Sequence, residues 1–269
     1  MKKWIAAALM FALASPAAAQ APKMQLWRLD CGKILIKEFN SFFSDTLEYK
    51  PGPREVVGSC YLIRHGDDYL LWDTGYPASF KGKPVDRGEA VASLSVTLPE
   101  QLAQLGLKPA DIDVVGISHM HGDHTGQAKD FPAAKLVVGK GDFEQTKGER
   151  DPFGPWRAEG AKLQLMHGAD IDIFGDGSAI ALNLPGHTPD HMALLVRLAS
   201  GNVLLSGDMY HATEARALKG IPPFNTSRAE TLASIDRFER LAKHWNAKVI
   251  IQHEPADVAK LPAFPKAAE

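Results

Sequence analysis

The sequence predicts an α/β fold, and two observations support this prediction. First, helix and strand signals alternate in the middle of the chain, where Thr97-Leu98-Pro99-Glu100 begins a helix and the apolar run 113–117 follows as a strand. Second, the later part contains several short β-like runs separated by turn residues, then an amphipathic helix and a last strand. Such alternation is typical of α/β proteins. With 269 residues, 45% of them hydrophobic, the chain can bury a sizeable core.

The first part of the chain predicts strands and loops. Short strands are expected at 25–29 and 34–37, followed by an aromatic loop, Phe39-Asn40-Ser41-Phe42-Phe43. This loop either docks onto the core or lines an apolar pocket. Two further apolar runs, 59–64 and 69–72, flank a polar connection that contains glycine, and this pattern predicts a β-hairpin.

Two helices have clear start signals. A capping box with a proline near the helix start, Thr97 to Glu100, predicts a helix that continues to about Leu107. A second capping box, Ser227 to Glu230, predicts an amphipathic helix through Trp245. A short helix is also expected from about Gly141. The remaining strands are expected at 113–117, 135–138, 162–166, 171–174, 179–184, 192–197, 202–205 and 249–251.

The N-terminus predicts export. Met1-Lys2-Lys3 is followed by a short apolar segment and by small residues up to Ala19, which is the pattern of a secretory signal peptide over residues 1–19. The apolar run is well under the ~20 residues that a membrane span needs, so we expect no stable membrane anchor. Residues 20–269 contain no linker-like segment and predict a single domain in the periplasm or outside the cell.

Charge and cysteine context argue against nucleic-acid binding and against catalysis by a cysteine thiol. The formal net charge is −2, and no basic stripe interleaved with aromatic residues is present, so no nucleic-acid partner is expected. The two cysteines, Cys31 and Cys60, both lie next to strand-like sequence. In an oxidising compartment they either form a disulfide across neighbouring strands or remain two small buried apolar residues. Neither has the context of a reactive thiol.

One stretch carries the strongest chemical signal. Ser118-His119-Met120-His121-Gly122-Asp123-His124-Thr125-Gly126 directly follows an apolar strand and contains three imidazoles and a carboxylate within six positions. Imidazole nitrogen and carboxylate oxygen are preferred ligands of borderline divalent ions. No packing requirement explains such a cluster, and its glycines allow the backbone to bend tightly. The stretch therefore predicts a metal site at the end of a strand.

Three later strand ends repeat this arrangement. His187 and His191 follow the run 179–184, Asp208 follows 202–205, and His253 follows 249–251. Together with the first loop they supply enough ligands for two ions, with His191 expected to support a ligand rather than to act as one. Asp73, at the end of the 69–72 run, either orients a neighbouring ligand through hydrogen bonds or caps a turn.

The motif His-x-His-x-Asp-His followed by separated His, Asp and His resembles the signature of the metallo-β-lactamase superfamily. The resemblance covers essentially the whole mature chain, including Asp73-Thr74-Gly75. It implies an αββα sandwich, in which two mixed β-sheets lie face to face with helices outside. It also implies that His119, His121 and His187 hold one metal, that Asp123, His124 and His253 hold the second, and that Asp208 bridges both.

Within the superfamily, the chain is most similar to an exported member of the N-acyl-homoserine lactonase family. The residues that carry this narrower resemblance are Leu29-Asp30-Cys31-Gly32, Ser59-Cys60-Tyr61-Leu62-Ile63 and Gly186-His187-Thr188-Pro189-Asp190-His191. That family has a substrate-contacting tyrosine three residues after the bridging aspartate. Here Tyr210 lies two residues after Asp208 and His211 lies three after it, so either residue is a candidate for this role.

This resemblance implies a quorum-quenching hydrolase that opens the lactone ring of N-acyl homoserine lactones. Two divalent ions, zinc by the superfamily's default, would convert a shared water to hydroxide, and Asp123 would orient it. The aromatic residues Phe39 to Phe43, Phe153, Trp156 and Phe224 suit a small amphiphilic ester with an acyl tail. The alternatives are a β-lactam hydrolase and a hydrolase of other esters, thioesters or phosphotriesters. The sequence leaves open whether the protein is a monomer or a homodimer.

Overall fold

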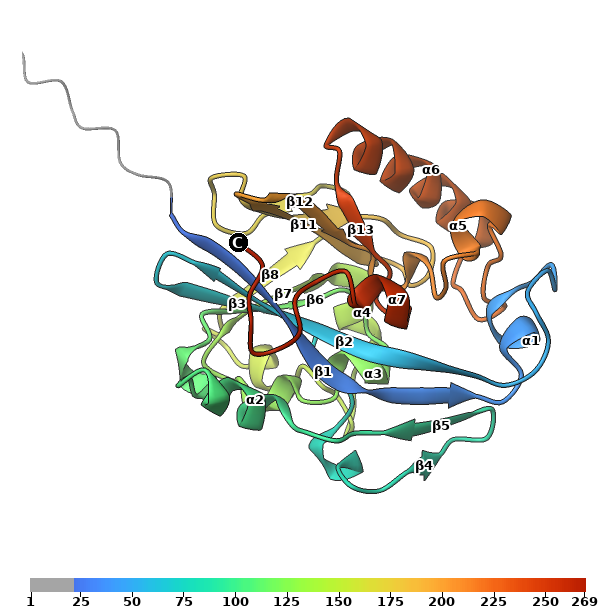
Figure 1. The fold of residues 1–269 in the computed structure, drawn as a ribbon. Helices are drawn as coiled ribbons and strands as arrows, with labels where there is room; N and C mark the ends of the chain where they lie inside the picture. The colour runs from blue at the N-terminus through green and yellow to red at the C-terminus, as the bar shows by residue number, and fades with distance from the viewer. Residues whose placement is uncertain (1–21) are drawn as a thin grey trace, which may run out of the picture.

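The computed structural model describes residues 22–269, and the predicted signal peptide, residues 1–19, lies outside this part of the chain. The described part forms two mixed β-sheets packed face to face, with helices on the outer faces (Figure 1). This arrangement confirms the predicted αββα sandwich.

The first sheet contains eight strands, antiparallel around β1 and β2 and parallel from β3 to β8. In spatial order these are β4 (Val85–Asp86), β5 (Ala90–Ser93), β1 (Met24–Ile36), β2 (Arg54–His65), β3 (Asp68–Trp72), β6 (Val114–Ile117), β7 (Lys135–Gly139) and β8 (Leu163–Met166). Because β3 and β6 run in the same direction, their carboxyl ends, which carry Asp73 and Ser118, meet at one edge of the sheet.

The second sheet contains five strands, and its order is β13 (Lys248–Ile250), β12 (Gly201–Leu205), β11 (Met192–Leu198), β10 (Ala179–Asn183) and β9 (Ile171–Asp172). β12 and β13 are parallel, and β11 is antiparallel to both β10 and β12. Therefore β10, β12 and β13 all run in the same direction, and the loops that follow them start from one edge of the sheet.

The helices cover the outer faces of the sandwich. They are α1 (Phe39–Phe43), α2 (Leu98–Gln104), α3 (Gly122–Thr125), α4 (Lys140–Gln145), α5 (Ala215–Leu218), α6 (Arg228–His244) and α7 (Pro255–Val258). In Figure 1, α6 lies over the second sheet, and α2 lies on the far side of the first. Both predicted N-caps are present: Thr97 forms the full capping box, and the Ser227 hydroxyl accepts a hydrogen bond from the Glu230 amide.

Alternating side chains of β11 show how the layers pack. Met192 and Leu194 contact the core between the two sheets, together with Trp72 of β3. Their neighbours Ala193 and Leu195 point to the opposite face and belong to the core beneath α6. A strand that is covered on both faces is apolar throughout, which explains why the sequence shows a continuous apolar run here rather than alternation.

Several local predictions need correction. The expected strands 25–29 and 34–37 are parts of one long strand, β1, because Cys31 is an extra residue in a β-bulge between Asp30 and Gly32. The aromatic segment 39–43 is a short helix rather than a loop. Strands β4 and β5, which are not among the predicted strands, pair with each other, and β5 also pairs with β1.

The pairing of β1 with β2 decides whether the two cysteines form a disulfide or remain separate buried residues. Cys31 and Cys60 form a disulfide, with their Cα atoms 5.8 Å apart. The β-bulge places Cys31 next to Cys60, whose direct partner in the register is Leu29. The strand that carries Cys31 is thereby linked covalently to the hairpin that leads to Asp73.

No helix within residues 22–269 has both the length and the apolar character needed to cross a lipid bilayer.

Candidate metal centre

The loops after four strands bring all seven predicted ligands together. His119 to His124 follow β6, His187 follows β10, Asp208 follows β12, and His253 follows β13. The parallel strand directions place these loops at one end of the sandwich. The main-chain amide of Met192 also donates a hydrogen bond of 2.7 Å to the Ser118 carbonyl, which ties the two sheets together beside the cluster.

The first group of ligand atoms comes from His119, His121, His187 and Asp208. The Nδ1 atom of His121 lies 3.1 Å from the Nε2 atoms of both His119 and His187. Asp208 Oδ2 lies 3.5 Å from His119 Nε2 and 3.4 Å from His187 Nε2. The ligand atoms of this group all lie within 4.8 Å of one another, as required for donors that share one ion.

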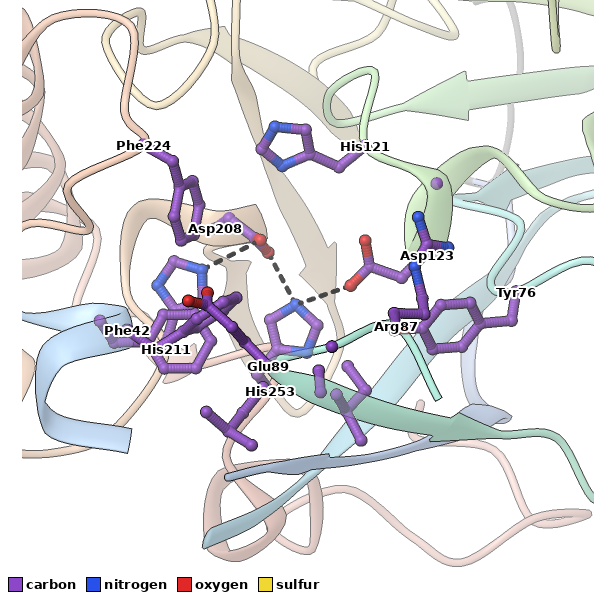
Figure 2. A pocket seen from close by; sticks show the side chains of 16 residues that line it. Phe42, Tyr76, Arg87, Glu89, His121, Asp123, Asp208, His211, Phe224 and His253 are labelled. Atoms are coloured by element: carbon purple, nitrogen blue, oxygen red, sulfur yellow. Dashed lines mark hydrogen bonds and ion pairs between the residues drawn. The ribbon is translucent and has the colours of Figure 1, made fainter. Parts of the chain in front are cut away.

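The second group comes from Asp123, His124 and His253, and it faces the other oxygen of Asp208. Asp208 Oδ1 lies 3.2 Å from His124 Nε2 and 3.0 Å from His253 Nε2. Asp123 Oδ2 lies 3.7 Å from both of these nitrogens. A single carboxylate therefore stands between two groups of donors, with one oxygen directed at each, as Figure 2 shows in part for Asp208 and His253.

The chemistry of the donors fits two cations. His124 Nε2 and Asp208 Oδ1 are buried and make no hydrogen bond with any residue in the described part of the chain, which is costly unless a ligand completes them. Although burial opposes it, the carboxylates of Asp208 and Asp73 raise the pKa of His124 well above its usual value. Burial likewise opposes ionisation of Asp208, but the imidazoles of His253 and His124 hold its pKa well below the usual range. The site thus favours positive charge between its carboxylates.

Four of the five ligand histidines have a fixed partner at Nδ1, whereas His121 faces the cluster with Nδ1 itself. Nδ1 of His253 donates to the Val57 carbonyl at 2.7 Å, and Nδ1 of His187 donates to Asn225 Oδ1 at 2.8 Å. Nδ1 of His119 lies 3.0 Å from the Ser118 hydroxyl. These contacts set the tautomers, so that the Nε2 lone pairs face the cluster.

Asp73 is the most connected of these supporting groups. Its carboxylate accepts hydrogen bonds from Nδ1 of His124 at 2.9 Å, from the Ser118 amide at 2.6 Å, from the Ser118 hydroxyl at 2.8 Å and from Gln252 Nε2 at 2.6 Å. The residue is fully buried and has a positive φ of 59°. Of the two alternatives that the sequence left open, the structure supports the orientation of a ligand.

A second buried carboxylate joins two of the ligand loops. Asp142, at the start of α4, accepts hydrogen bonds from the Met120 amide, the Thr188 hydroxyl and the Asp190 amide. Met120 lies between two ligands and Thr188 follows another, so the Asp142 side chain sets the spacing of both loops.

His191 has the supporting role that the sequence predicted: its Nε2 accepts a hydrogen bond of 3.0 Å from the Asp208 amide.

The structure distinguishes the two candidates for the substrate-contacting residue. The Tyr210 hydroxyl donates to Glu239 Oε1 on α6 at 2.9 Å, and the side chain does not line the pocket. The geometry therefore does not support Tyr210. His211 lines the pocket, lies 3.1 Å from Asp208 Oδ2 through Nε2, and is stacked between Phe43 and His253. Burial lowers the pKa of His211 to about 4, although Asp208 opposes this, so the imidazole is neutral at pH 7.

A cavity of about 560 Å³ opens onto the cluster (Figure 2). His121, Asp123, Asp208 and His253 form its polar floor. One wall is apolar and consists of Ile34, Ile36, Phe42, Phe43, Ala90 and Phe224. Tyr76 and Arg87 lie on the other side of the cavity, beside Asp123, and Glu89 also lines it. A pocket with these two sides suits an amphiphilic small molecule.

The aromatic predictions are only partly correct. Phe42, Phe43 and Phe224 line the pocket, whereas Phe39 and Phe43 are buried, so the segment 39–43 both docks onto the core and lines the cavity. Phe153 and Trp156 are buried in the core on the outer face of the first sheet and take no part in the pocket. Their assignment to substrate binding was wrong, because composition does not tell which face of the sandwich a loop covers.

Sequence reasoning also missed functional positions. Ser118, Gln252 and Asn225 orient ligands, and Tyr76 lines the cavity. The first two are direct sequence neighbours of predicted ligands, which is a usable signal. Tyr76 follows Asp73-Thr74-Gly75 and Asn225 follows Phe224, but these neighbours do not show that the two side chains reach the centre.

Sequence comparisons agree with this geometry. The model of the metallo-beta-lactamase superfamily matches residues 53–253. The chain is 32% identical over 238 residues to N-acyl homoserine lactonase AttM of Rhizobium radiobacter, which covers 78% of this chain and 88% of the relative. It is 30% identical over 217 residues to N-acyl homoserine lactonase AiiB of Agrobacterium fabrum, covering 70% and 78% of the two chains.

Solved structures share the fold. A structure of an N-acyl homoserine lactone hydrolase with N-hexanoyl-L-homoserine at its catalytic metal centre matches with a TM-score of 0.76 at 21% identity. The match covers 93% of this chain and 100% of that chain. AidC, a dizinc quorum-quenching lactonase in complex with a product, matches with a TM-score of 0.63 at 17% identity, covering 92% and 90%. At these identities the likeness concerns the fold alone.

Proposed function

Because the chain belongs to the metallo-β-lactamase superfamily, we propose that it is a dinuclear metal-dependent hydrolase that opens the lactone ring of N-acyl homoserine lactones. The observation that carries this proposal is a cavity that opens onto the seven-ligand cluster, with four of the ligands at its floor and aromatic and aliphatic side chains beside them. Relatives that are 30–33% identical are named N-acyl homoserine lactonases, which supports the same substrate class and a quorum-quenching role.

Two zinc ions are the proposed cofactors. His119, His121 and His187 would hold one ion, Asp123, His124 and His253 the other, and Asp208 would contact both. When bound, such ions acidify a shared water and polarise the carbonyl of the ester. Imidazole and carboxylate ligands also suit iron, cobalt and manganese. One structural neighbour, AidC, is a dizinc lactonase, which supports zinc.

The side chains around the floor have separate tasks. Asp123 is buried apart from the face it turns to the cavity, where its carboxylate orients the attacking water. His211 lies 3.1 Å from Asp208 Oδ2 through Nε2 and is the candidate donor to the negative charge that develops on the carbonyl oxygen. Because a neutral imidazole has a single N–H, this hydrogen would have to turn from Asp208 to the substrate oxygen as the charge develops. Removing such a donor costs about 3 kcal/mol of transition-state stabilisation in well-studied cases. The Phe43 ring, 4.1 Å from that imidazole, keeps it in place.

A substrate panel tests the proposal. Purified protein reconstituted with zinc should release protons rapidly with N-acyl homoserine lactones and slowly or not at all with β-lactams, thioesters and phosphotriesters. The same protein treated with a chelator should be inactive and should recover when zinc is added back. Rapid hydrolysis of a β-lactam without hydrolysis of acyl lactones would reject the lactonase assignment.

The apolar wall predicts a dependence on acyl-chain length. Phe42 is half-buried beside the cavity and packs against Phe43 and Phe224, so Phe42→Ser should remove apolar contact area from a long tail only. We expect kcat/KM to fall about tenfold for a decanoyl lactone and about twofold or less for a butanoyl lactone, measured by proton release. Phe174→Ser is the matched control, since Phe174 is partly buried next to His65, outside the cavity. Equal losses for both chain lengths would remove Phe42 from the tail-binding site.

We also propose that the protein is exported to the periplasm or beyond. The composition of residues 1–19 and the Cys31–Cys60 disulfide support this proposal, because disulfides persist in oxidising compartments. Fractionation of cells that express the full chain should yield a periplasmic or secreted form. Its intact mass should equal that of a chain that begins at Gln20. Retention of the uncut chain in the cytoplasm would contradict export.

A further inference from the structure

Tyr76 is a largely buried residue whose hydroxyl is open to the cavity and has no partner in the described part of the chain. The residue is only 5% exposed and lines the pocket, yet its hydroxyl makes no hydrogen bond with any residue among 22–269. Its ring is stacked on Phe80, with centroids 5.4 Å apart and an interplanar angle of 18°. Gly32 leaves room for the ring edge, since a Cβ atom there would lie 3.1 Å from a ring carbon. Figure 2 shows the ring on the side of Asp123.

The main chain holds Tyr76 at a fixed place relative to the ligands. The Tyr76 carbonyl accepts a hydrogen bond of 3.0 Å from Gln127 Nε2, and the Gly75 carbonyl accepts one of 2.7 Å from the Gly126 amide. A Cβ atom on Gly126 would lie 2.2 Å from the nitrogen of Pro77, so α3 and this loop are in close contact. Because α3 carries Asp123 and His124, the position of the Tyr76 ring is set by the same contacts that set these ligands.

The hydroxyl is a hydrogen-bond donor rather than an acid. Burial raises the pKa of Tyr76, and the nearby Asp123 carboxylate raises it further, so the phenol keeps its proton near neutral pH. A phenol donor that is open to the cavity and has no protein acceptor is available to a substrate oxygen placed there.

The location of Tyr76 indicates which substrate oxygen this is. The positive charge of Arg87 is close enough to offset part of the rise in the Tyr76 pKa, and Arg87 is an exposed residue that lines the cavity. No ion pair or side-chain hydrogen bond holds its guanidinium to any residue of the described chain. Two donors on the side opposite the aromatic wall match the two lone pairs of a neutral carbonyl oxygen that lies beside the reacting ester.

We propose that Tyr76, assisted by Arg87, binds the amide carbonyl oxygen of the substrate's acylamino group and so makes the enzyme selective for lactones that carry this group. The inference rests on the proposed lactonase function and assigns a specificity-determining residue within it. Tyr76 is not required to act on the ester itself.

The test compares two lactones with and without the acylamino group. For Tyr76→Phe, we expect kcat/KM with N-hexanoyl homoserine lactone to fall about tenfold, the size expected for the loss of one hydrogen bond. The loss should lie in KM, with kcat within about twofold, because the amide contact is equally strong before and during ring opening. With γ-hexalactone, which has the ring but no amide, kcat/KM should stay within about twofold. Arg87→Met should show the same selectivity with a smaller loss.

Controls separate recognition from folding. Tyr76→Phe keeps the ring stack on Phe80, and its metal content and thermal midpoint should equal those of the native protein. Tyr69→Phe is the matched control, since Tyr69 lies at the opposite end of β3 and outside the cavity. An equal loss with both lactones, or a loss with neither, would overturn the inference while leaving the lactonase function standing. Failure of the native protein to open N-hexanoyl homoserine lactone would instead reject the proposed function, and this inference with it.

Discussion

Replacement of Asp208 by asparagine is expected to abolish most of the activity while leaving the fold intact. The two carboxylate oxygens of Asp208 lie between 3.0 and 3.5 Å from the Nε2 atoms of four ligand histidines, and each oxygen faces a different group of ligands. Asparagine has almost the same shape, but it removes the negative charge and turns an amide donor toward positions where cations would bind. The loss should therefore exceed about 100-fold in kcat/KM, the upper end of what losing an outer hydrogen-bond partner of a metal ligand costs.

Three measurements define this result. Steady-state hydrolysis of an acyl lactone gives kcat/KM, elemental analysis gives the number of metal equivalents, and thermal unfolding followed by circular dichroism reports the fold. We expect lost activity, fewer bound ions and a nearly unchanged unfolding midpoint in the metal-free form. Asp176→Asn is the control, because Asp176 pairs with His65 at an exposed site away from the cluster. Near-normal turnover of Asp208→Asn would argue against a centre that two ions share.

Asp73→Asn is expected to lower both stability and activity. The Asp73 carboxylate accepts four hydrogen bonds, from His124, from two groups of Ser118 and from Gln252, and it is fully buried. An amide nitrogen in place of one oxygen would face these donors and leave at least one without an acceptor. The free energy of unfolding should fall by about 3 kcal/mol, as expected when a buried, charged hydrogen-bond network is broken.

The same substitution should weaken the second metal group in particular. Without Asp73 the imidazole of His124 loses the contact that fixes its tautomer, so affinity for one of the two ions and kcat/KM should each fall about 10–100-fold. Urea denaturation and chelator competition measure the two effects separately. Asp113→Asn is a suitable control, since Asp113 accepts the Tyr69 amide at the opposite, exposed end of the same strand pair. Unchanged metal affinity in Asp73→Asn would reduce Asp73 to a structural role.

The fold and the ligand set could be predicted because their signals are local. An apolar run marks each buried strand, and the ligands follow such runs directly, as His119 follows β6 and His253 follows β13. Parallel strands end at the same edge of a sheet, so the residues that directly follow different strands lie close together there. This holds for any conformation of the longer loops. This rule is why scattered histidines and aspartates could be assigned to one centre from their order alone.

The errors concern residues whose role depends on direction or on the opposite face. Phe153 and Trp156 have the same composition signal as Phe224, but their loop packs on the outer face of the first sheet. Tyr210 and His211 are neighbours in the sequence, yet the chain leaves the 3₁₀ turn 207–209 in an extended conformation that sends Tyr210 to Glu239 and His211 to Asp208. Adjacent residues in extended backbone point to opposite sides, and only the surrounding packing decides which side is the pocket.

The sequence by itself determined the layer architecture and the seven residues that gather at one edge, because strand periodicity and ligand chemistry are properties of short segments. Only the tertiary structure decided which residues orient those ligands, that Cys31 reaches Cys60, and that Tyr76 turns a free hydroxyl into the cavity. These features join segments up to 196 residues apart, as in the contact of His253 with Val57. Their geometry depends on bulges, close backbone contacts and packing faces, which no local pattern encodes.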